Sequence, residues 1–139
     1  MKKLVYQHGA CMKIINAKNA PKAIGSYSQA VLSNNFMFIS GQIPINPNTG
    51  QLIDDSFDNQ VRQILDNINA ILFTEKISFS SVVKITVFVI DLSNVQIINN
   101  IFKDYFIDSH LPARSMVQVS KLPMDAELEI DIIASINDK

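Results

Sequence analysis

The feature that most constrains the fold is an unbroken alternation near the C-terminus, where every second residue from Leu128 to Ile136 is apolar. Because successive side chains of a β-strand point to opposite faces, this pattern predicts a strand with one face in a hydrophobic core. The intervening positions include Glu129 and Asp131, and Glu127 precedes them in the same set. These carboxylates must therefore face solvent, a partner chain or a ligand.

This strand belongs to a longer segment, Pro112 to Ala134, which reads as two strands joined by a turn at Leu122-Pro123. Arg114 stands at the start of the first strand, and a hairpin would bring it close to Glu129 in the second. Spacing alone favours an ordinary cross-strand ion pair. The carboxylates gathered on one face favour a site where the guanidinium fork holds a substrate carboxylate beside a water activated by Glu129. The second reading predicts a small acidic substrate.

Composition predicts a single domain that associates with copies of itself. The 139 residues are 47% hydrophobic, which is enough for one core. Only 18% of the residues are charged, below the ~25% typical of soluble domains, so part of the surface is expected to lie under another subunit. The formal net charge is -1, and no run of Lys or Arg could follow a phosphate backbone. Nucleic-acid binding is therefore not expected.

The cysteine and histidine content offers little for disulfide or metal chemistry. Cys11 is the single cysteine and the histidines are His8 and His110, so neither an internal disulfide nor a structural zinc site is expected. No run approaches the ~20 apolar residues of a membrane span, and the start of the chain lacks the apolar stretch of a secretory signal. A cytoplasmic protein is expected, although the absence of Asp and Glu before Asp54 leaves an organellar presequence open.

Two amphipathic helices are predicted in the middle of the chain. Apolar residues between Ser56 and Glu75 recur at the i, i+3, i+4 spacing of one helical stripe. The second helix is expected after Ser93, which with Gln96 makes an S-x-x-Q capping box. Asn99 lies close to the apolar stripe of this helix, where its amide either has a polar partner in the core or contacts a substrate.

The strands predicted around these helices complete an α+β fold. Val82 to Ile90 is rich in β-branched residues and nearly continuous in apolarity, which predicts a central strand buried on both faces. Ser40-Gly41-Gln42, at a strand end, predicts a bulge or a close backbone approach to a ligand. The other strands are expected at 12–16, 27–32 and 36–43. Two helices then cover one face of a mixed sheet in a single domain, residues 12–139, preceded by a loose extension, residues 1–11.

Four stretches of the sequence carry a resemblance to a known family. They read NAPKAIGSYSQAV, SGQIPINPNTG, VVKITVFVIDL and PARSMVQVSKLPMDAELEIDIIA, and they occur in the family's order between Met12 and Ile136. In these motifs the chain resembles the Rid family of imine deaminases, also labelled YjgF or L-PSP endoribonuclease. The resemblance implies a chorismate-mutase-like α+β protomer, a homotrimer and three sites in the clefts between subunits. It implies neither a cofactor nor a metal.

The resemblance also implies a role for particular residues. Arg114 matches the clamp for the substrate carboxylate, and Glu129 matches the group that positions the attacking water. The other matched positions line the substrate pocket: Tyr27, Ser40, Gly41, Asn99 and Met116. Ser26 stands where the family usually has proline, and Met116 stands where many members have cysteine. These two departures are expected to change the substrate size that the pocket prefers.

The activity implied is hydrolysis of reactive 2-imino acids and their enamine tautomers, such as 2-iminopropanoate and 2-iminobutanoate, to 2-oxo acids and ammonia. Two alternatives stay open. The family label also implies an endoribonuclease or translation inhibitor, but metal-free RNA cleavage usually needs histidines, and both lie outside the matched motifs. A trimer that binds small anions, or acts like a chaperone, without chemistry would keep Arg114 but would gain nothing from Glu129.

Overall fold

The computed structural model describes residues 4–7, 10–107 and 110–136. Within them the chain forms one seven-stranded sheet. The strands are β1 (Leu4–Gln7), β2 (Ala10–Ile15), β3 (Ala30–Ser33), β4 (Phe36–Gln42), β5 (Val82–Val89), β6 (Ala113–Gln118) and β7 (Leu128–Ser135). The helices are α1 (Phe57–Phe73) and α2 (Val95–Tyr105), with single 3-10 turns η1 (Phe79–Ser81), η2 (Leu92–Asn94) and η3 (Pro123–Asp125).

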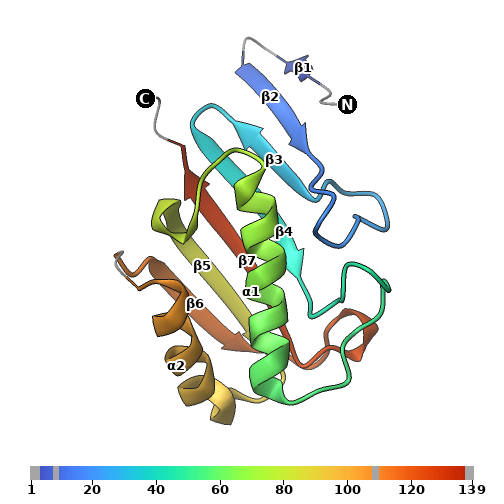
Figure 1. Ribbon diagram of the computed structural model, residues 1–139, viewed down its shortest axis with the longest axis vertical. Helices are drawn as coiled ribbons and strands as arrows, with labels where there is room; N and C mark the ends of the chain where they lie inside the picture. Colours follow the sequence, from blue (N-terminus) through green and yellow to red (C-terminus); the bar gives the residue numbers. More distant parts are fainter. Residues whose placement is uncertain (1–3, 8–9, 108–109, 137–139) are drawn as a thin grey trace.

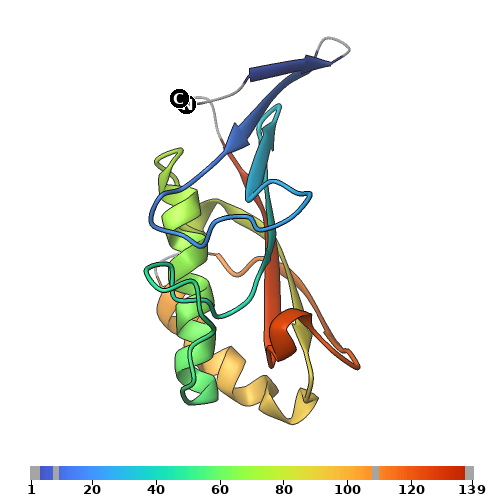
Figure 2. The same cartoon turned by 90° about the vertical axis from the view of Figure 1, so that its right-hand side faces the viewer.

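The sheet is mixed, and both α-helices lie on one side of it (Figures 1 and 2). Its strand order is β1-β2-β3-β4-β7-β5-β6. Every neighbouring pair is antiparallel except β5 and β6, which are parallel and are connected through α2. A parallel pair needs such a crossover, because the chain must return to the same end of the sheet. The α+β class and the helices on one face are therefore confirmed.

The core lies between α1 and the sheet, as the helical periodicity predicts. Ser56 begins the helix, because its Oγ accepts a hydrogen bond from the Asn59 amide at 3.3 Å. The apolar stripe of α1 is buried against the inward sets of the central strands. Its buried apolar residues are Val61, Ile64, Leu65, Ile68, Ile71 and Leu72. The predicted boundaries, 56–75, agree with the observed helix to within two residues at each end.

The entry into α2 differs from the predicted capping box. Asp91 accepts a hydrogen bond from the Ser93 amide at 2.9 Å, and this contact starts the 3-10 turn η2. The N-cap of α2 is Asn94, which makes no side-chain capping bond. The Ser93–Gln96 box is therefore wrong, because the Asp91 carboxylate forms a local turn that moves the start of the α-helix onward.

The predicted hairpin between the last two strands is also wrong. β6 pairs with β5 from Lys84↔Ala113 to Val89↔Gln118, and β7 pairs with the other edge of β5. Figure 1 shows β5 between them. The connection is too long for a tight turn and includes η3, where Met124 and Asp125 have positive φ angles of 56° and 57°. The chain therefore crosses over β5 between β6 and β7.

The side of the sheet away from the helices is only partly covered in the single chain. The outward set of β5, including Thr86 and Phe88, is half-buried, although a strand buried on both faces was predicted. Phe38 is 46% exposed and Val117 is 44% exposed on this side. We call this side the open face. The predicted burial of β5 on both faces is wrong for one chain, because both α-helices pack on the other side.

The described part of the N-terminal extension adds an edge strand. β1 pairs with β2 from Leu4↔Lys13 to Gln7↔Ala10. β2 is joined to the domain by pairing with β3 and by an ion pair between Lys13 and Glu75, at the end of α1. The remaining residues of the predicted extension, 1–3 and 8–9, lie outside the described residues. Within the described parts of the chain, no helix has the length and apolarity needed to cross a membrane.

Candidate functional site

A cavity of about 430 Å³ lies where the end of β4, the start of β7 and three loops meet. One loop comes between β2 and β3, the second follows β4, and the third contains η3. The cavity brings together four of the residues predicted for a site: Tyr27, Ser40, Gly41 and Glu129. Most of its other lining side chains are apolar, including Ile24, Ile43, Ile45 and Met124. It therefore combines a carboxyl group with a largely apolar wall, as small-molecule sites do.

Tyr27 lies in the loop before β3, which begins only at Ala30 although a strand from 27 was predicted. The buried side chain of Gln29 holds this loop: its Oε1 accepts from the Ala17 amide at 2.7 Å, and its Nε2 donates to Pro21 O at 2.8 Å. Tyr27 is 51% exposed at the cavity wall. These hydrogen bonds of the Gln29 side-chain amide explain why the segment is a fixed loop and not a longer strand.

Ser40 and Gly41 form a bulge, because the pairing of β4 with β7 changes register between Ile39 and Gln42. The Ser40 hydroxyl donates to Ser28 O at 2.6 Å, and this bond holds the Tyr27 loop. The lone pairs of the hydroxyl oxygen can still accept a hydrogen bond. At Gly41, a Cβ atom would collide with the Glu129 carboxylate, lying 2.6 Å from Cδ. The absence of a side chain at Gly41 therefore makes room for Glu129.

Glu129 is half-buried in β7 opposite Phe88. Burial, and then the nearby charge of Asp131, raise the pKa of the Glu129 carboxyl above its ordinary value. Burial also raises the pKa of Asp131, against a hydrogen bond from Thr86 and the charge of Lys84. A carboxyl group with a raised pKa takes up and releases a proton more readily near neutral pH, which suits it to acid-base chemistry.

The other three predicted site residues lie elsewhere, on the helix side of the edge strand β6. Arg114 and Met116 are level with the inward residues Ile85 and Val87 of β5. The Arg114 Nη1 donates to Asn99 Oδ1 in α2 at 2.6 Å. We call Arg114, Asn99 and Met116 the edge group. The amide of Asn99 thus has a polar partner, as the sequence required.

The edge group and the cavity are separate within one chain. Strand β5 lies between Arg114 and Glu129, and the two side chains belong to opposite faces of the sheet. The predicted approach of Arg114 to Glu129 is therefore wrong for a single chain, since it assumed a hairpin. None of the ion pairs formed by the described residues includes Arg114, whose side chain is exposed. Its charge is available to an anion.

Sequence reasoning missed three residues that shape these surfaces. Gln29 anchors the Tyr27 loop, and nothing in the sequence around it indicates this role. Met124 lines the cavity from a left-handed backbone conformation that sequence does not reveal. Phe102 lies under Arg114, with 5.8 Å between the guanidinium carbon and the ring centroid. The spacing of three residues between Asn99 and Phe102 in a helix could have indicated a shared face.

The fold and the cavity define an α+β protein with a largely apolar site that contains one carboxyl group. Residues 17–136 match the family model described as Endoribonuclease L-PSP. A RutC family protein of Pyrococcus horikoshii is 45% identical over 122 residues, covering 88% of this chain and 96% of the relative. Reactive Intermediate Deaminase A, chloroplastic, of Arabidopsis thaliana is 39% identical over 124 residues, covering 89% of this chain and 66% of the relative.

Solved structures agree with these sequence matches. The Escherichia coli TdcF structure with bound serine has a TM-score of 0.84 and 40% sequence identity, and the match covers 89% of this chain and 98% of that one. The chain therefore belongs to the Endoribonuclease L-PSP family, the group also called Rid or YjgF. Reactive intermediate deaminases are among its relatives.

Proposed function

We propose that the protein is a deaminase that hydrolyses small 2-imino acids, such as 2-iminopropanoate and 2-iminobutanoate, to 2-oxo acids and ammonia. The observation that carries this proposal is the Glu129 carboxyl, which has a raised pKa, lines a largely apolar cavity and has space beside it because residue 41 is glycine. A site that only bound anions would be weakened by a carboxylate there. The name of the Arabidopsis relative supports a deaminase.

The proposed reaction needs one proton carrier and an anion clamp. Ionised Glu129 accepts a proton from water as the water oxygen attacks the imine carbon. The same proton is returned to nitrogen, which gives a carbinolamine. Glu129 then carries the proton of the new hydroxyl to the nitrogen, so that the carbon–nitrogen bond breaks, ammonia leaves and the carbonyl of the 2-oxo acid forms. The Arg114 fork holds the substrate carboxylate through two parallel hydrogen bonds. Serine bound to the TdcF relative also carries a carboxylate, which supports a ligand of this size and charge.

We further propose that the working form is a homotrimer in which the edge group of one subunit closes the cavity of the next. Arg114 and Glu129 cannot meet within one chain, because β5 separates them. The open face, with Phe38 and Val117 nearly half exposed, supports burial against other copies of the sheet. The contact between subunits that completes the site would then also remove the apolar side chains of the open face from water, which is favourable.

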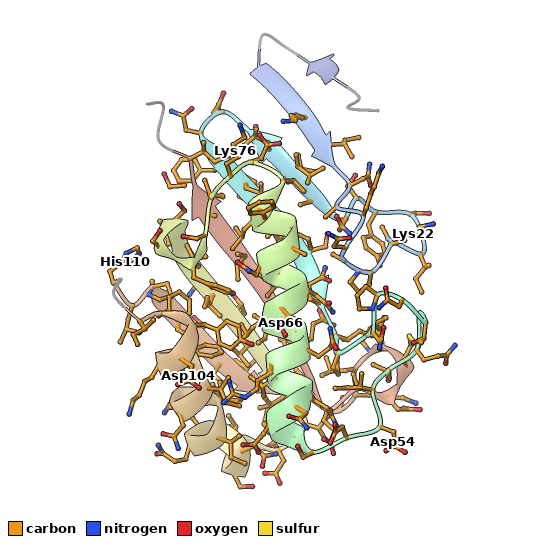
Figure 3. All side chains as sticks on the ribbon, viewed as in Figure 1. Lys22, Asp54, Asp66, Lys76, Asp104 and His110 are labelled. Atoms are coloured by element: carbon orange, nitrogen blue, oxygen red, sulfur yellow. The ribbon has the colours of Figure 1, made fainter. Side chains whose placement is uncertain are left out.

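An endoribonuclease is the function named by the family description, but the placement of His110 does not favour it. In Figure 3, His110 and Lys22, a lining residue of the cavity, lie on opposite sides of the molecule. The His110 Nε2 is 2.8 Å from Val82 O. His8 lies outside the described residues.

We also propose a cytoplasmic location from the sequence argument, although the Arabidopsis relative is named chloroplastic.

The test is release of 2-oxo acid and ammonia from imino acids generated in the assay by an amino acid oxidase. The protein should raise the release rate above spontaneous hydrolysis. Glu129→Gln should lower this gain by about 10²- to 10⁴-fold, the usual contribution of general acid-base catalysis. Glu127→Gln is the matched control, since Glu127 is exposed and does not line the cavity. Equal activity in wild type and Glu129→Gln would leave an anion-binding trimer as the better account.

A further inference from the structure

Arg114 is held by neutral groups. Its Nη1 donates to the amide oxygen of Asn99 at 2.6 Å, and its guanidinium carbon lies 5.8 Å from the centre of the Phe102 ring. A carboxylate partner would offset the positive charge, whereas an amide oxygen and an aromatic face leave it in place. The guanidinium therefore keeps its charge for a ligand while its position is restricted.

Phe102 is a rigid support for this cation. It is 5% exposed, and its ring centroid is 6.0 Å from that of Phe106. Phe106 meets Phe79 edge-on at 5.2 Å, and Phe79 meets Tyr105 edge-on at 5.4 Å. We call Phe79, Phe102, Tyr105 and Phe106 the aromatic cluster. Because each ring is packed against another, Phe102 cannot turn its face away from Arg114 without disturbing the cluster.

We propose that Phe102 is a positioning residue for Arg114. The guanidinium carbon lies over its ring, and Asn99 occupies one of the five N–H donors, so the remaining donors are left for a carboxylate. This inference rests on the proposed function for the identity of the ligand. An arginine held in place before binding loses less rotamer freedom when the carboxylate arrives, which strengthens binding.

The variant test compares Phe102→Leu with Phe79→Leu. Both remove a ring from the aromatic cluster, but Phe79 is not the ring beneath Arg114. Phe102→Leu should weaken binding of 2-oxobutanoate about 2- to 5-fold, the range expected for an exposed cation–π contact, and should raise KM more than it lowers kcat. Binding of the neutral 2-oxobutanamide should change less. Phe79→Leu should lower stability and change the affinity for 2-oxobutanoate less than Phe102→Leu does.

The inference is overturned if Phe102→Leu binds 2-oxobutanoate like wild type, or if Phe79→Leu loses the same affinity. Calorimetry gives the affinities, and urea unfolding gives the stability of each variant. Wild type that neither binds 2-oxobutanoate nor hydrolyses imino acids would refute the proposed deaminase. Wild type that does both, with an unaffected Phe102→Leu, would refute only the role of Phe102.

A second measurement, by NMR, tests the contact without any substitution in the aromatic cluster. Arg62 and Arg114 are the two arginines of the chain, so arginine labelled with ¹⁵N gives two Nε–H signals, and Arg62→Lys assigns them. The proton signal of Arg114 should be displaced by the ring current of Phe102, and Arg62, paired with Asp104 at 2.9 Å, serves as the reference. An Arg114 signal at the position of a free arginine would overturn the inference, whether or not the protein is a deaminase.

Discussion

Gly41→Ala should separate the chemistry of the site from its binding. An added Cβ would collide with the Glu129 carboxylate, at 2.6 Å from Cδ and 3.0 Å from Cγ. The obstacle is the end of a flexible side chain, so Glu129 can rotate away while the backbone stays in place. We expect an off-rotamer cost of about 0.5–1.5 kcal/mol in the free energy of unfolding.

The effect on turnover should be much larger than the effect on stability. A displaced Glu129 no longer reaches the water, so hydrolysis should fall by about 10²- to 10⁴-fold, as for loss of an acid-base group. Binding of 2-oxobutanoate should persist, because the edge group supplies the carboxylate contacts in the proposed site. Turnover, calorimetric affinity and urea unfolding on the same preparation would measure these three quantities.

Two further proteins make the test decisive. The double variant Gly41→Ala with Glu129→Gln should be no less active than Glu129→Gln, because both changes remove one interaction. Gly50→Ala is the control for glycine replacement, since it has a φ of 72° but nothing within 4 Å of the added Cβ. It should lose some stability through backbone strain and keep its turnover. Wild-type turnover in Gly41→Ala, or a further loss in the double variant, would refute the reasoning.

Three more predictions follow from the proposed site. Arg114→Lys should greatly weaken the use of 2-imino acids, because a point charge cannot reproduce the two-bond fork; full activity in this variant would contradict the clamp. Light scattering should give three times the chain mass of 15.5 kDa, and a monomer at micromolar concentration would contradict a site between subunits. The raised pKa of Glu129 predicts a stability contribution that is present at low pH and is lost as the pH rises through the folded-state pKa. Glu129→Gln should therefore unfold at a higher urea concentration than wild type at pH 7, and an equal or lower midpoint there would count against the raised pKa.

Most elements could be predicted from the sequence, because a helix or strand that buries one face repeats apolar residues at a fixed spacing along the chain. Strand β1, in the stretch expected to be a loose extension, was not predicted. The spacing of apolar residues identified α1 closely, and the strict alternation from Leu128 identified β7. The polar set of β7 also indicated that the Glu129 carboxyl faces solvent, a partner chain or a ligand and not the core. In these cases the direction of each side chain depends only on its place within one helix or strand, so residues close together in the sequence are enough to predict it.

Strand pairing was decided only by the tertiary structure, since nothing local records which strand a β-strand will join. The sequence order suggested that β6 and β7 form a hairpin, but β6 pairs in parallel with β5 through the α2 crossover. That single choice places Arg114 beside Asn99 and Phe102 and separates it from Glu129. The sequence by itself determined most of the elements and the chemical types of the site residues. The packing of distant segments decided which of them meet, because contacts such as Gly41 with Glu129 depend on atoms that only the folded chain brings together.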